Sequence, residues 1–148
     1  MDIYHLLVHL HSVLRWVLLL FVVMAIILSF PIKSGASRPG FNNLKAALWA
    51  MSTAHLQLIL GLVLYFISPK VVFDTASMKN PVMRFFLVEH ILVMLIAIAL
   101  ITIGYISGKK KTDISKRNRL IVVYFLISLI LILSRVPWPF LGYGGGWI

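Results

Sequence analysis

Residues 82–107 read VMRFFLVEHILVMLIAIALITIGYIS, and this stretch decides the class of fold. A helix needs about 20 largely apolar residues to cross the hydrocarbon core of a bilayer. The stretch is long enough, and its charged or imidazole side chains are Arg84, Glu89 and His90. It therefore predicts a transmembrane helix that carries polar groups inside the span, where they are costly.

Three more stretches have the same character, namely residues 4–30, 44–67 and 120–137. Hydrophobic residues make up 61% of the 148-residue chain, whereas about 45–50% is usual in soluble domains. The mean hydropathy is +0.99. A soluble fold of this size cannot hide so much apolar surface, so we expect the bilayer to be the solvent. The prediction is one all-α domain, residues 1–148, with four spans.

Proline, glycine and capping residues separate the spans. Those expected at helix ends are Asn43 for the second helix, Asn80 and Pro81 for the start of the third, Gly108 for its end, and Asp113 or Ser115 for the start of the fourth. The first linker contains Pro31, Gly35, Pro39 and Gly40. Because short linkers force neighbouring helices to be antiparallel, the sequence predicts an integral membrane up-down four-helix bundle.

The linkers differ strongly in charge. The first and third carry Lys33, Arg38, Lys45, Lys109, Lys110, Lys111, Lys116, Arg117 and Arg119, whereas the opposite side carries Lys70, Lys79 and Arg84 beside Asp2 and Asp74. Basic linkers stay in the cytoplasm, which predicts a multi-pass membrane protein with both termini on the outer side. The net charge of +10 therefore reports topology, and without a patch that interleaves aromatics it does not indicate nucleic-acid binding.

Polar residues inside the spans are the candidate functional residues, because at membrane depth they mark function or specific pairing. They are His9, His11 and Arg15 in the first span, His55 in the second, Glu89 and His90 in the third, and Arg135 near the end of the fourth. A rise of ~1.5 Å per residue puts His11 and His90 roughly 10–12 Å from the outer boundary, and Arg15 and His55 roughly 16–18 Å. We expect His11, His55 and His90 to converge in the outer half of the bundle.

The helical period groups some of these residues on shared faces. His11 and Arg15 are four residues apart and share one face, as do His90 and Met94. The face of His90 continues through small side chains at Ala97 and Gly104, which allows either a slot for a flat cofactor or close packing of two helices.

Glu89 is the acidic residue inside a span, and an ionised carboxylate there needs a partner. Arg15 is the partner expected from depth, and Arg84 or Arg135 are alternatives nearer the surface. Either a structural ion pair or a role in proton transfer fits this residue. Arg135 is expected either to anchor an acidic group or to extend toward water.

Histidines on separate helices, in a chain without cysteine, suit haem b. We expect His90 to be one axial ligand and either His55 or His11 to be the other, with buried arginines, Arg15 and Arg135, near the propionates. Copper is an alternative, because Met51 with His55 and His90 with Met94 place soft sulfur beside imidazole. A second alternative is a non-haem accessory subunit or small transporter. No serine or carboxylate pair supports a stand-alone hydrolase, so any enzyme activity is expected to be redox chemistry.

The chain resembles small four-helix membrane proteins of Bacteroidota that are labelled cytochrome b. The motifs that carry the resemblance are His11-Ser12-Val13-Leu14-Arg15-Trp16, Ala54-His55-Leu56-Gln57 with Gly61, Val88-Glu89-His90 with Met94, and Pro137-Trp138-Pro139. Residues 55–61, HLQLILG, are also similar to helices of haem A synthase and of cytochrome b561-type proteins. The chain departs from the latter in having four spans and no second pair of ligands. The resemblance implies haem binding and electron transfer in a bacterial inner membrane, with both termini periplasmic. It also implies the bilayer, a quinone or a larger respiratory complex as partners, and homo-oligomerisation is left open.

Overall fold

The computed structural model describes residues 2–30 and 42–147, and all regular structure within them is helical. The elements are α1 (Ile3–Ser29), α2 (Asn43–Ile67), the 3-10 helix η1 (Thr75–Lys79), α3 (Pro81–Arg84), the π-helix η2 (Phe85–Glu89), α4 (His90–Lys109), α5 (Ile114–Arg135) and the 3-10 helix η3 (Pro139–Leu141). The all-α prediction is confirmed for this part of the chain. Residues 31–41, including Lys33 and Arg38, lie outside it.

Four helices are long and apolar enough to cross a membrane: Ile3–Ser29, Asn43–Ile67, the continuous helix Pro81–Lys109, and Ile114–Arg135. Many of their large apolar side chains face outward, as Leu20, Ile59 and Ile130 do with 58%, 59% and 60% of their surface exposed. Extended apolar surface of this kind is unfavourable in water and suits lipid. The helices are therefore compatible with a multi-pass membrane protein.

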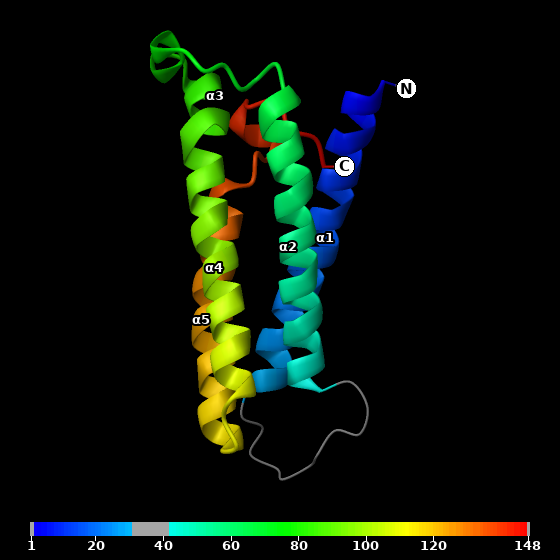
Figure 1. The fold of residues 1–148 in the computed structure, drawn as a ribbon, viewed down its shortest axis with the longest axis vertical. Coiled ribbons are helices and arrows are strands. Elements are labelled where there is room, and N and C mark those ends of the chain that lie inside the picture. The colour runs from blue at the N-terminus through cyan, green and yellow to red at the C-terminus, as the bar shows by residue number, and fades with distance from the viewer. Residues whose placement is uncertain (1, 31–41, 148) are drawn as a thin grey trace.

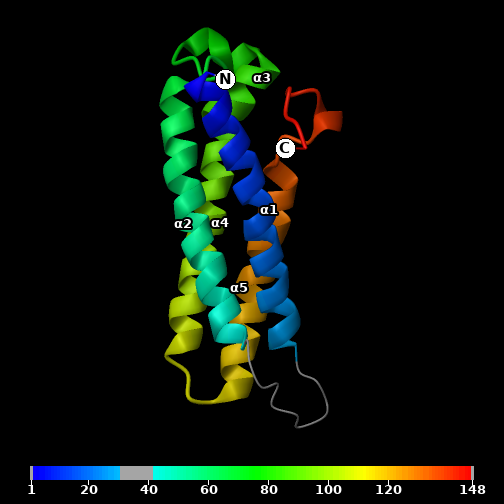
Figure 2. The ribbon, with the colours of Figure 1, turned by 90° about the vertical axis from the view of Figure 1, so that its right-hand side faces the viewer.

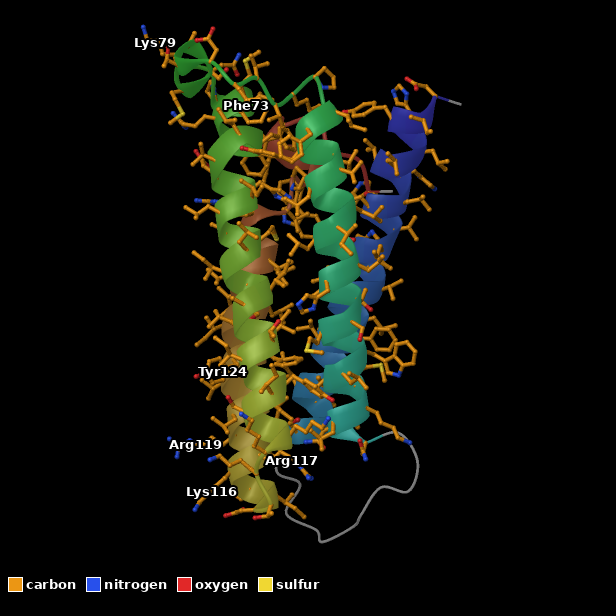
Figure 3. All side chains as sticks on the ribbon, viewed as in Figure 1. Phe73, Lys79, Lys116, Arg117, Arg119 and Tyr124 are labelled. Carbon is orange, nitrogen blue, oxygen red and sulfur yellow. The ribbon has the colours of Figure 1, made fainter. Side chains whose placement is uncertain are left out.

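The four long helices lie side by side and form one bundle (Figures 1 and 2). α1 packs on α2 and α5, and α4 packs on α5 and α2. Both chain ends lie at the same end of the bundle. We call the half of the bundle at that end the terminal half, and the half that holds the α4–α5 turn the loop half. The labelled basic residues Lys116, Arg117 and Arg119 lie at the far end of the loop half (Figure 3).

The helix ends follow mostly from local side-chain chemistry. The Asn80 side chain accepts hydrogen bonds from the backbone amides of Val82 and Met83, at 3.0 and 3.2 Å, and Pro81 occupies the first turn as predicted. Asp113 caps α5, one of the two residues predicted to do so, and the helix therefore begins at Ile114, before the apolar run of residues 120–137. The first turn of α5 is exposed, so a pattern of buried apolar residues does not mark it. The capping residue Asp113 does mark it.

Two predicted helix ends are wrong. Asn42 caps α2, and Asn43 instead directs its side chain into the bundle, where its amide donates to Asn118 Oδ1 at 2.7 Å and to Ser29 Oγ at 3.2 Å. Gly108 does not end α4, which continues to Lys109. A Cβ atom on Gly108 would lie 3.1 Å from Ile121, so this glycine serves close packing of α4 on α5.

The loop half has a tightly packed core. Val22, Ala25, Ala47, Ile101 and Phe125 are all fully buried there. The small-residue face that begins at His90 packs on α5 in this half. A Cβ atom on Gly104 would lie 2.6 Å from Tyr124 Cβ, a distance that real Cβ atoms do not reach. Gly104 and Gly108 thus serve helix packing, one of the two alternatives expected for this face.

The third span changes its helical geometry just before His90. The π-helix Phe85–Glu89 lies between α3 and α4 in one continuous helix. A π-turn takes one more residue than an α-turn, and such turns are frequent at functional sites. The Arg84 Nε donates to Glu89 Oε1 at 2.9 Å across this turn. Residues five apart do not share a face of an α-helix, so this ion pair depends on the π geometry.

Candidate functional site

A cavity of about 210 Å³ lies between the helices in the terminal half. Its walls come from α1, α2, η2, α4 and α5, from the linker after α2, and from the three glycines 144–146 in the glycine-rich segment 143–147 that follows η3. The polar side chains that line it are Tyr4, His11, Ser12, Arg15, Gln57, Tyr65, Ser68, Lys70 and His90. Among the lining residues there are two cationic side chains, Arg15 and Lys70, and no carboxylate. The cavity therefore combines imidazoles, positive charge and apolar walls.

His90 enters the cavity from α4 directly after the π-turn. Its Nδ1 hydrogen-bonds the backbone carbonyl of Arg135 at 2.7 Å, so Nδ1 is the donor and carries the proton. A neutral imidazole held in this way presents the lone pair of Nε2 to the cavity, as metal-ligating histidines do. Phe85 and Phe86 lie beside the ring, and Met94 lines the cavity one turn later. The predicted pairing of His90 and Met94 on one face is confirmed.

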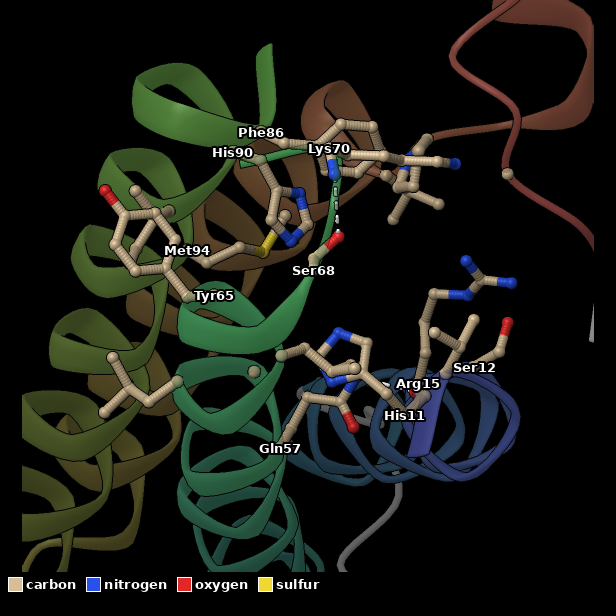
Figure 4. A pocket seen from close by; sticks show the side chains of 18 of the residues that line it. His11, Ser12, Arg15, Gln57, Tyr65, Ser68, Lys70, Phe86, His90 and Met94 are labelled. Atoms are coloured by element: carbon tan, nitrogen blue, oxygen red, sulfur yellow. Dashed lines mark hydrogen bonds between the residues drawn. The ribbon is translucent and has the colours of Figure 1, made fainter. Parts of the chain in front are cut away.

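His11 enters the same cavity from α1 (Figure 4). Its Nδ1 is buried and has no hydrogen-bond partner in the described part of the chain. Gly61 lies against this edge of the ring, where an added Cβ atom would be 3.2 Å from His11 Cε1. The Gln57 amide donates to the His11 backbone carbonyl at 2.8 Å and joins α2 to α1 at this level. The imidazole is therefore positioned by packing, with a polar atom buried against α2.

Arg15 is 8% exposed and lies one turn below His11 on the cavity side of α1, as predicted. Its Nη2 donates to the backbone carbonyls of Gly146 and Trp147, at 3.3 and 2.9 Å. The guanidinium carbon also lies 5.6 Å from the ring centre of Trp16 and 5.8 Å from that of Trp138. A buried cation thus has neutral partners and no carboxylate among the described residues that bond to it.

Sequence reasoning missed Lys70 as a site residue; it lies in the linker after α2 and lines the cavity. Its Nζ donates to the carbonyls of Tyr143 and Gly144, at 3.2 and 2.9 Å, and lies 5.1 Å from the ring centre of Phe86. Partial burial lowers the pKa of Lys70 below its ordinary value. One signal in the sequence was available, since Lys70 is a basic residue directly after a span on the side with few basic residues.

Three predicted site residues do not line the cavity. His55 is exposed on the far side of α2, and its Nδ1 bonds the Met51 carbonyl one turn earlier at 2.8 Å. Glu89 pairs with Arg84, one of the alternatives, and not with Arg15. The guanidinium of Arg135 bonds the neighbouring Ser134 carbonyl at 3.1 Å, so Arg135 contributes its backbone carbonyl to the site. Of the three histidines expected to converge, His11 and His90 share the cavity.

The described residues contain no group of three or more His, Asp or Glu side chains placed to hold a bare metal ion. The copper alternative, which pairs imidazole with methionine sulfur, is a different kind of site and stays a prediction. Haem makes a smaller demand on the protein, because the porphyrin itself supplies the equatorial nitrogens and the protein supplies one or two axial ligands. The donor set of His11 and His90 fits this demand.

Comparisons with models of protein families, with curated proteins and with solved structures give no match for this chain.

Proposed function

We propose that this chain is a b-type cytochrome-like membrane protein that binds haem between its helices and transfers electrons. The observation that carries the proposal is the pair His11 and His90, whose imidazoles come from separate helices and line one cavity (Figure 4). The hydrogen bond from His90 Nδ1 to a backbone carbonyl fixes the tautomer that leaves Nε2 free for an axial bond. The His11 ring lines the cavity beside Gln57, and its buried Nδ1 has no hydrogen-bond partner among the described residues.

The walls of the cavity fit a flat apolar ring with polar edges. Leu18, Leu58 and Ile98 supply apolar surface from three helices, and Arg15 supplies positive charge at one edge. When bound, haem supplies a one-electron couple whose potential depends on its axial ligands and on burial. The cavity of about 210 Å³ is smaller than the 300–1,000 Å³ usual for cofactor sites, so binding requires lining groups to move.

The same proposal includes a membrane topology. The spans run in alternating directions through the bacterial inner membrane, with the loop half toward the cytoplasm and both termini in the periplasm. The basic residues near the α4–α5 turn, at the far end of the loop half in Figure 3, support this orientation. The cavity then lies in the periplasmic half of the bundle, where a quinone in the bilayer or a periplasmic redox protein would exchange electrons.

An absorption spectrum tests the proposal. Protein purified from cells with ample haem should show a Soret band, and reduction with dithionite should sharpen the α band. The His90→Ala variant should lose both, whereas His9→Ala should keep them because His9 is exposed on the surface of α1. A colourless wild-type protein from such cells would contradict the proposal.

A further inference from the structure

The cations of the cavity share an unusual set of partners. Arg15 and Lys70 come from elements far apart in the sequence, and both donate to backbone carbonyls of the segment 143–147. Trp16 adds a third contact, since its Nε1 donates to the Trp147 carbonyl at 2.8 Å. The segment therefore occupies the space in front of both cations.

Neutral carbonyls are weak partners for two cations removed from water. A hydrogen bond between two charged groups is about twice as strong as one between neutral groups. Among the lining residues no carboxylate competes for Arg15 or Lys70. An anionic group at this place would be attracted by both cations. Its attraction would offset the free-energy cost of removing each cation from water.

The segment is built so that its carbonyls approach the cations closely. Gly142 and Gly144 have positive φ angles, 73° and 67°, which favour glycine. A Cβ atom on Gly144 would lie 3.1 Å from Lys70 Nζ, and one on Gly145 would overlap the carbonyl of Pro137. Gly144 and Gly146 are exposed, and the ring of Tyr143, stacked on Phe85 at 4.1 Å, holds the start of the segment. Such a segment can leave the cations while Tyr143 keeps it attached.

We propose that Arg15 and Lys70 form the acid-group subsite of the cavity, where the two propionate carboxylates of haem replace the carbonyls of residues 143–147. This inference rests on the proposed function and adds Lys70 and the C-terminal segment to it. It also accounts for the small cavity, because withdrawal of the segment enlarges the space between α1 and α4. Arg135, the second cation expected from the sequence, has no part in this subsite.

Titration of the haem-free protein with two porphyrins tests the subsite. Full-length protein from haem-deficient cells is placed in phosphatidylcholine nanodiscs and titrated with hemin and with hemin dimethyl ester, whose propionates carry no charge. Wild-type protein should bind hemin about thirtyfold more tightly than the ester, the product of the contributions expected from the two cations. Arg15→Gln and Lys70→Gln should each weaken hemin binding, by about tenfold and about threefold, and leave ester binding unchanged.

Matched variants control for charge and folding. Lys79→Gln removes an exposed cation at the same end of the bundle, outside the cavity lining, and should not change the ratio of the two affinities. Arg15→Lys keeps the charge and should recover part of the preference for hemin. Quenching of tryptophan fluorescence reports the titration and also the movement of Trp147.

The outcomes separate the two proposals. If neither porphyrin binds, the proposed function fails. If hemin and its ester bind wild type equally tightly, haem binding stands and the subsite is wrong. A third result would be equal affinities for the two porphyrins together with thermal stabilisation by phosphatidylglycerol, a stabilisation that both glutamine variants lose. This result would overturn the subsite and assign the two cations to a lipid headgroup.

Discussion

The same four helices pack closely in one half of the bundle and lie apart around a cavity in the other half. In the loop half, small residues let α4 and α5 approach until Gly104 leaves no space for a Cβ atom, and the polar group of Asn43 is paired with Asn118 and Ser29. In the terminal half, a cavity separates the helices and is lined by His11, Arg15 and Gln57. A closely packed half thus holds the helices together, and the other half places polar side chains around a cavity.

Deletion of Val88 should produce the largest change, because it removes the additional residue of the π-turn. One residue corresponds to a rotation of about 100° in an α-helix, so either His90 or the segment before it must change direction. We expect haem content to fall at least tenfold, to the background level, while helix content by circular dichroism is retained. Val88→Ala, which keeps the number of residues, should retain haem. Full haem content after the deletion would show that the π-turn does not position His90.

Two glycine variants should separate stability from ligand binding. Gly104→Ala forces a contact with Tyr124 Cβ and should lower the free energy of unfolding by about 1–3 kcal/mol. Gly61→Ala meets the ring edge of His11, which can shift, so its stability should change by less than about 1 kcal/mol while the haem spectrum changes. Unfolding in detergent mixtures and reduced spectra of both variants provide the measurements. A larger destabilisation by Gly61→Ala than by Gly104→Ala would contradict the claim that the loop half is the more closely packed one.

Removal of the polar cluster in the loop half should have an intermediate effect. Asn43→Ala leaves Asn118 without its 2.7 Å partner and should destabilise the bundle by about 1–3 kcal/mol. The haem spectrum should not change, because the cluster lies at the other end of the bundle from the cavity. A shifted spectrum with unchanged stability would contradict this division of roles.

The ion pair across the π-turn should have the smallest effect. Both side chains are partly exposed, Arg84 at 44% and Glu89 at 31%, so their coupling should be within about 0–1 kcal/mol. Arg84→Gln, Glu89→Gln and the double variant form a thermodynamic cycle that measures it. A coupling energy above this range would show that the ion pair stabilises the π-turn more than its exposure predicts.

The sequence predicts the spans well and the site in part, for identifiable reasons. Apolar runs of sufficient length define the helices, and depth alone places His11 and His90 at one level. The rotation of each helix about its axis depends on packing against its neighbours, which the sequence of one helix does not contain. His55 precedes the lining residue Gln57 by two positions, about 200° around the helix, and so faces away.

The π-turn and the linkers limit the prediction further. An α-helical period does not put Arg84 and Glu89 together, so their pairing could not be expected from spacing. Lys70 lies outside every span, and its approach to the cavity depends on how the linker after α2 folds back over residues 143–147. Both features arise from geometry that deviates from regular secondary structure.

The most direct test of haem binding by His11 and His90 is the haem content of His11→Ala and His55→Ala, measured side by side with wild type. Both residues were candidates for the second axial ligand, and the structure places His11 alone of the two at the cavity. If His11 and His90 hold the haem, His55→Ala should keep one haem per chain with a wild-type reduced spectrum, and His11→Ala should lose the sharp α band. Loss of the haem in His55→Ala with retention in His11→Ala would contradict it.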